Sequence, residues 1–142
     1  MNINTMLSVL VFLLLTASPT VWAQEKFKAT PVLKASTTVA GQKIAYPKTD
    51  KPEITSLLLE IEPGGESGLH MHPNPTYVHV LEGTLTVQMG DGSTHNYKAG
   101  EAFLEIVGGW HNGKNTGKAP VKVLVVFTGE EGKPNLIRPE KK

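Results

Sequence analysis

The chain has 142 residues, a formal net charge of +1 and no cysteine. A charge this close to zero argues against a nucleic-acid partner or a basic membrane-binding face. The absence of cysteine excludes disulfides, cysteine ligands and a cysteine nucleophile, so a domain of this size has to be stabilised by its core.

The first 23 residues have the layout of a secretory signal peptide. Residues 6–15 are almost wholly apolar but too short to span a bilayer comfortably. Ser18 and Pro19 end this run, and small residues precede a cleavage point after Ala23. An uncleaved N-terminal anchor is the alternative, whereas a lipoprotein is excluded because no cysteine follows the cleavage point. We expect a mature domain of residues 24–142, periplasmic or secreted, with no membrane association after cleavage.

Residues 24–142 predict one all-β domain. Apolar or alternating runs are separated by glycine-rich turns, at 34–39, 41–47, 54–61, 77–81, 84–89, 95–97, 102–107 and 121–128. Short strands at this spacing favour a sandwich or a barrel, and no segment after residue 24 has a convincing helical period. The charged, proline-containing tail, 129–142, is expected to run over the surface or fray.

Three of the five histidines have the spacing of a metal site. His70 and His72 flank one residue, so on a strand both rings would lie on the same face. His111 follows about forty residues later, after two glycines. Such a set is a usual way to gather imidazoles around one divalent metal inside a β-barrel. His79 has the opposite strand parity and His95 lies in a hairpin, so neither is expected to be a ligand.

Two sequence blocks extend this pattern beyond the histidines. The first contains Gly64, His70, His72, Thr76 and Gly83, and the second contains Gly100, Ile106, Gly108, His111 and Asn115. In spacing they resemble the two motifs of the cupin superfamily, over about residues 54–128. Thr76 stands where the family usually has its glutamate ligand, and Ile106 stands where the second motif usually has proline.

The resemblance implies an exported single-domain cupin, that is, a β-barrel of the double-stranded jelly-roll type. It also implies one divalent transition metal (Fe, Mn, Ni, Cu or Zn) held by His70, His72 and His111, a small-molecule ligand or substrate, and often a homodimer. The fold hosts dioxygenases, isomerases, decarboxylases and binding modules, so it does not choose the function.

The residues around the histidines have several expected roles. Thr76 can face the site, or it simply packs or forms a hydrogen bond. Its hydroxyl is a poor metal ligand, so three neutral imidazoles would leave the metal with a formal +2 charge that favours anionic guests. Glu105 is the candidate catalytic proton acceptor if its side chain reaches the cavity, where it could also be a ligand or support one. The alternative is a solvated strand residue or a hairpin salt bridge. Glu66, in the loop before His70, is a second carboxylate that could serve the site, but it is expected to be a solvated loop residue. Trp110 is expected to wall the cavity mouth or pack in the core, and Asn115 to lie close to the site.

Three hypotheses about function remain open. The first is a metalloenzyme, dioxygenase-like or isomerase-like, using Fe(II) oxygen chemistry or Lewis-acid chemistry on a small anionic substrate. The second is a non-catalytic module that binds a small molecule or a metal. The third is a structural β-sandwich in which the histidines have no ligand role.

Overall fold

The computed structural model describes residues 26–140, so the expected signal peptide at 1–23 lies outside the described residues. The described chain forms seven strands: β1 (Pro52–Ile61), β2 (Thr76–Glu82), β3 (Thr84–Met89), β4 (Thr94–Lys98), β5 (Ala102–Leu104), β6 (His111–Lys114) and β7 (Val121–Glu130). Within residues 26–140 no helix has the length and apolar character needed to cross a membrane.

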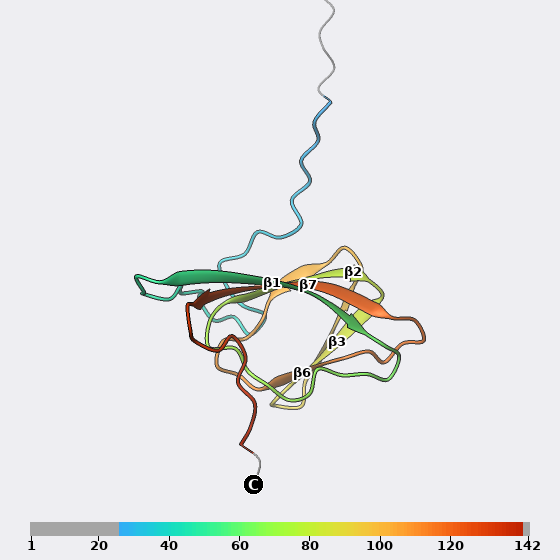
Figure 1. Cartoon of the computed structure of the whole chain (residues 1–142). Coiled ribbons are helices and arrows are strands. Elements are labelled where there is room, and N and C mark those ends of the chain that lie inside the picture. The colour runs from blue at the N-terminus through green and yellow to red at the C-terminus, as the bar shows by residue number, and fades with distance from the viewer. Residues whose placement is uncertain (1–25, 141–142) are drawn as a thin grey trace, which may run out of the picture.

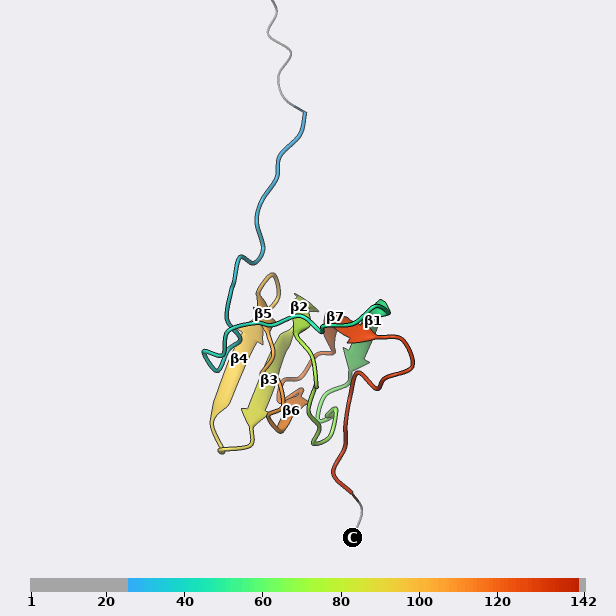
Figure 2. The same ribbon diagram turned by 90° about the vertical axis from the view of Figure 1, so that its left-hand side faces the viewer.

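The strands form two antiparallel sheets that face each other. One sheet has the order β1-β7-β2-β5 and the other has the order β4-β3-β6. Figure 1 shows β1, β7 and β2 as the upper layer, with β3 and β6 below, and Figure 2 shows β4, β3 and β6 side by side. This arrangement confirms the predicted all-β jelly roll.

The core lies between the two sheets and follows from strand alternation. In β7 every second residue is buried, from Val121 to Phe127, and the intervening residues are only partly covered. Val78 and Val80 of β2 and Phe103 of β5 fill the same space, because alternate side chains of a strand share one face. The two sheets therefore enclose an apolar interior whose open end is available for a site.

Three expected elements differ from the structure. The runs at 34–39 and 41–47 form only an isolated bridge between Thr37 and Lys43. The strand expected over 102–107 ends at Leu104. Strand β6, His111–Lys114, falls in a segment to which no strand was assigned. The tail does run over the surface, but it is anchored, because Met71 and Ile137 exchange both backbone hydrogen bonds.

Candidate metal centre

The three histidines of the motifs come together at one end of the barrel. His70 and His111 form an isolated antiparallel bridge, and His111 opens β6, opposite Met89 of β3. His72 lies beside Val107, and its carbonyl accepts a hydrogen bond from the Gly108 N–H at 2.8 Å. The ring centroids of the three imidazoles are 4.4 to 5.1 Å apart.

Each imidazole is oriented by a backbone carbonyl on its Nδ1 side. The carbonyl oxygens of Gly68, Asn135 and Gly109 lie 2.7 Å from His70 Nδ1, 2.7 Å from His72 Nδ1 and 2.9 Å from His111 Nδ1 respectively. A carbonyl oxygen only accepts, so each Nδ1 carries the proton. In the neutral ring Nε2 is then left with a free lone pair, which is the form that binds a metal.

The three histidines also bring possible ligand nitrogens close together. One ligand atom from each of the three histidines lies within 4.8 Å of the others. His111 Nε2 is buried and has no hydrogen-bond partner among the described residues. A buried nitrogen without a partner costs free energy unless something binds it. Three imidazoles suit Fe, Mn, Ni, Cu or Zn, so the residues present fit a divalent transition metal.

Burial and mutual charge set the protonation of these groups. Burial lowers the pKa of His70 to about 4, and the neighbouring His111 and His72 add to this effect. Burial also lowers the pKa of His111, but the Glu105 carboxylate 3.4 Å away outweighs this effect and raises that pKa above its ordinary value. His70 is therefore neutral at physiological pH, whereas the proton on His111 depends on Glu105.

Glu105 is a buried carboxylate in direct contact with two of the histidines. Its Oε2 lies 2.8 Å from His72 Nε2, and its Oε1 lies 3.4 Å from His111 Nε2. Burial would raise the pKa of Glu105, but hydrogen bonds from His111 and His72 overcome this and lower it to about 2. The structure thus places Glu105 beside the histidines, and its side chain is not that of a solvated strand residue.

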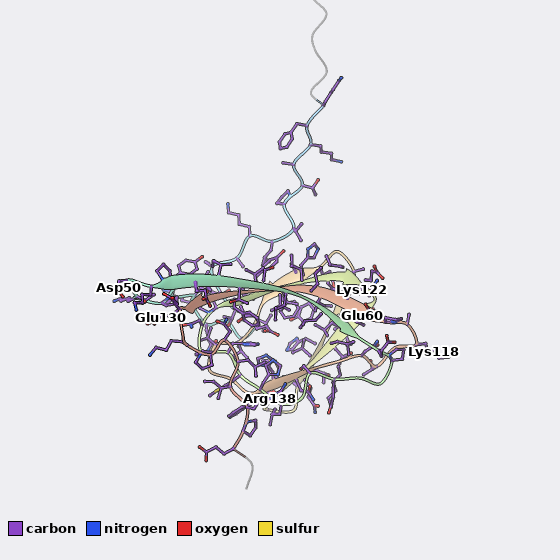
Figure 3. The ribbon with its side chains drawn as sticks, viewed as in Figure 1. Asp50, Glu60, Lys118, Lys122, Glu130 and Arg138 are labelled. Carbon is purple, nitrogen blue, oxygen red and sulfur yellow. The ribbon has the colours of Figure 1, made fainter. Side chains whose placement is uncertain are left out.

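A largely apolar chamber of about 290 Å³ opens beside the histidines. Its floor includes His70, His72 and Glu105, and its walls come from β1, β3 and β7, with Leu57, Leu85, Val125 and Phe127 among them. The tail adds Leu136 and Arg138, and the Arg138 Nη2 donates to the Ser67 carbonyl at 3.0 Å. Figure 3 shows Arg138 on the side of the molecule where the tail leaves.

Thr76, expected at the cavity, is buried, and its hydroxyl donates to the Asn74 carbonyl at 3.2 Å. It does not line the chamber. This hydrogen bond uses the hydroxyl proton locally, as the alternative of a packed or hydrogen-bonded threonine anticipated.

Trp110 and Asn115 are placed differently from the expectation. Trp110 borders two other pockets with Met89 and Gly90, and it does not line the histidine chamber. Its neighbour His111 faces inward, and strand alternation turns Trp110 the other way. Asn115 is 1% exposed, and its amide is fully used by the Ile61 and Ala119 carbonyls and the Gly117 N–H. Asn115 therefore ties loops together and does not contact the site.

The other two histidines and Glu66 lie outside the centre, as expected. His79 faces the outer side of β2, near Tyr77, and His95 is exposed on β4. Glu66 accepts a hydrogen bond from the Asn112 amide at 2.9 Å and pairs with Lys114 at 3.6 Å. Its carboxylate supports the loop before His70.

The sequence did not reveal the contributions of Asn135 and Arg138. Asn135 acts through its backbone carbonyl, and since every residue type has one, the sequence gives no signal for this contact. Arg138 stands in a charged, proline-containing tail that resembles a solvated terminus in composition. A positive residue in such a tail gives no sign that it will fold back over a chamber.

A family model of the cupin domain matches residues 57–127, half of the chain. The chain therefore belongs to the cupin family. Germin-like protein subfamily 2 member 2 of Arabidopsis thaliana is 38% identical over 77 residues, which are 51% of this chain and 35% of that protein. The chain thus spans about a third of the length of this curated relative.

Two solved oxalate decarboxylases are also similar. The enzyme of Lactobacillus farciminis, solved as a formate complex, is 27% identical with a TM-score of 0.52, over 59% of this chain and 26% of that chain. A Bacillus subtilis enzyme, described with Mn(II) centres, is 27% identical with a TM-score of 0.51, over 59% of this chain and 23% of that one.

Proposed function

We propose that this protein is an exported metalloenzyme of the cupin family that acts on a small carboxylate with an apolar body. The observation that carries the proposal is the set of three buried imidazoles, each with Nδ1 beside a backbone carbonyl and with one ligand nitrogen apiece within 4.8 Å of the others. Rings oriented in this way have lost the freedom that a solvated histidine would retain.

The chamber supports the substrate class. Its walls are apolar, and Arg138 supplies a guanidinium that forms no ion pair within residues 26–140. A guanidinium recognises a carboxylate with two parallel hydrogen bonds, and the leucine, valine and phenylalanine side chains suit an apolar body. Similarity to an oxalate decarboxylase solved with formate also favours a carboxylate, although the apolar walls suit oxalate itself poorly.

The chain's own residues bind and orient the substrate. His70, His72 and His111 would hold the metal, which when bound supplies Lewis-acid or oxygen chemistry. Arg138 at the mouth fixes the carboxylate, and the apolar walls exclude water from the body of the substrate. Similarity to an enzyme with Mn(II) centres supports a transition metal and leaves its identity open.

Elemental analysis of the protein, purified without a polyhistidine tag, tests the metal site. We expect about one transition-metal ion per chain in the wild type and none in the triple variant His70→Ala, His72→Ala, His111→Ala. The matched control is His79→Ala, His95→Ala, which removes the two histidines outside the centre and should keep the metal. A wild type that neither contains nor binds a metal refutes the proposed function.

The proposal of export rests on the sequence of residues 1–23. N-terminal sequencing of the protein from the exported fraction of a bacterial host should find a chain that begins near Gln24. Recovery of the full chain in the membrane fraction would instead support the uncleaved anchor.

The homodimer expected from the family stays a prediction. The outer face of the β1-β7-β2-β5 sheet carries exposed apolar side chains, with Leu58 75% and Ile54 67% exposed. Light scattering coupled to gel filtration measures the mass in solution directly.

A further inference from the structure

Thr76 and Glu105 are opposite one another on neighbouring strands. The register of β2 and β5 pairs Tyr77 with Leu104, and one step further the Glu105 N–H donates to the Thr76 carbonyl at 2.9 Å. Residues directly opposite in an antiparallel pair have their side chains on the same face, with Cβ atoms about 4.5–5.5 Å apart. A carboxylate at position 105 therefore enters the space that a glutamate at position 76 would occupy.

The Glu105 carboxylate faces the metal-binding nitrogens of His72 and His111. Its oxygens lie 2.8 and 3.4 Å from the Nε2 atoms of His72 and His111, whose Nδ1 atoms face backbone carbonyls. Nitrogen and oxygen lone pairs at these distances repel unless a positive charge lies between them, either a proton on Nε2 or a metal ion. A metal ion shared by the three side chains would take the place of such protons.

The distances from Glu105 to His72 and His111 also match those between ligand atoms of one metal. Nitrogen and oxygen ligands lie about 2.0–2.2 Å from a first-row ion, so adjacent ligand atoms are about 3 Å apart. The two contacts of Glu105 bracket this value. Glu105 is also 8% exposed, and a buried carboxylate is normally paired or bound to a metal.

We propose that Glu105 is the fourth protein ligand of the metal and replaces the carboxylate that is missing at Thr76. This inference rests on the proposed function, because it assumes that the three histidines bind a metal. The carboxylate comes from position 105 and not from position 76, which lies opposite it, and its oxygens lie beside the imidazoles of His72 and His111.

The assignment changes the chemistry expected of the site. Three imidazoles and one carboxylate leave a divalent ion with a formal +1 charge in place of +2. An octahedral ion would keep two positions for molecules that enter from the chamber. In this assignment Glu105 is a ligand, and the role of catalytic base falls to another group.

Relocation of the carboxylate tests this assignment. Mn²⁺ and Co²⁺ affinity would be measured by competition with a chelator in the wild type, in Glu105→Gln and in the double variant Glu105→Ala, Thr76→Glu. We expect Glu105→Gln to lose at least about tenfold in affinity, as seen when residues supporting a metal are removed. The double variant should recover most of this loss, because it restores a carboxylate to the same face. The control Glu66→Gln changes a carboxylate outside the centre and should bind like the wild type.

The outcomes separate the ligand assignment from the proposed function. Wild-type affinity in Glu105→Gln overturns the assignment of Glu105 and leaves the three-histidine site intact. A wild type without metal affinity overturns the proposed function as well. If Glu105→Gln does not fold, the double variant tests the ligand assignment. Metal binding by a folded double variant supports the assignment, and absence of binding refutes it. The visible absorption of the Co²⁺ form gives a second readout, which should change in Glu105→Gln and remain unchanged in Glu66→Gln.

Discussion

His70 and His111 exchange two backbone hydrogen bonds, of 2.9 and 2.8 Å, so two distant segments of the chain hold their imidazoles side by side. The ring centroids are 4.4 Å apart. The main chain therefore sets the separation of these two ligands, and only the ring rotation remains to be fixed. The carbonyls of Gly68 and Gly109 fix that rotation.

The tail should control metal affinity through Asn135. A chain that ends at Pro134 loses the carbonyl that orients His72, and we expect metal affinity to fall about 10- to 100-fold, as for other groups that orient metal-bound histidines. The matched control is a chain that ends at Arg138, which keeps Asn135 and the Met71–Ile137 bridge and should bind like the wild type. Isothermal titration with Zn²⁺ measures both, and equal affinities would contradict the role given to Asn135.

Stabilisation by a metal should increase between pH 6 and pH 8. Glu105 raises the pKa of His111, so the metal-free protein holds a proton there that a metal has to displace at the lower pH. The stability contributed by the raised pKa is complete below the unfolded value of 6.5 and is lost as the pH rises through the folded value. As the pH rises, the metal-free protein therefore loses this stabilisation, and the His111 proton that competes with the metal dissociates. His70, with a pKa of about 4, stays neutral throughout.

Thermal unfolding with and without Zn²⁺ at pH 6, 7 and 8 checks this expectation. The difference between the two melting temperatures should grow with pH. A difference that is constant or shrinks would mean that no proton on His111 competes with the metal.

Arg138 should determine the preference for carboxylates. We expect 4-methylpentanoate to bind the metal-loaded protein, and its neutral amide to bind weakly. Arg138→Gln should reduce binding of the acid about tenfold or more, because a hydrogen bond to a charged group contributes about 1.5–3 kcal/mol. Arg138→Lys keeps the charge but loses the paired geometry, so an intermediate loss is expected. Similar affinities for acid and amide in the wild type would refute this role.

Asn115 should matter for stability and not for the metal. Asn115→Ala leaves the Ile61 and Ala119 carbonyls and the Gly117 N–H without partners, and we expect unfolding to become easier by about 2–4 kcal/mol. Urea denaturation measures the loss. The control Asn96→Ala removes an exposed contact with Thr86 and should change stability by less than about 0.5 kcal/mol. Loss of metal from folded Asn115→Ala would show a role at the site that the structure does not indicate.

The fold and the histidine cluster could be predicted because their signals are local. Alternation in β7 and the H-x-H spacing place side chains on known faces, and the glycine turns divide the chain into strands. Strand β6 could not be predicted, since His111–Lys114 is short, polar and contains Gly113. Its pairing with β3 is a tertiary effect that overrides weak strand propensity.

The position of Glu105 illustrates the limit of motif reasoning. Parity along one strand could show that Thr76 offers no carboxylate, but it could not show that the neighbouring strand brings one to the same place. That requires the register between β2 and β5, which depends on contacts across the sheet. The same limit applies to Asn135, whose contribution is a main-chain carbonyl.

If the three histidines bind a metal, the convergence of separate chain segments would also determine when it is acquired. In an unfolded chain only His70 and His72 are near each other, because His111 and the Asn135 carbonyl are brought to them by contacts of the folded chain. Metal binding would then follow folding, and the metal ions in the compartment where folding finishes would select the occupant. Two hosts that fold the same chain on opposite sides of a membrane would yield proteins with different metals.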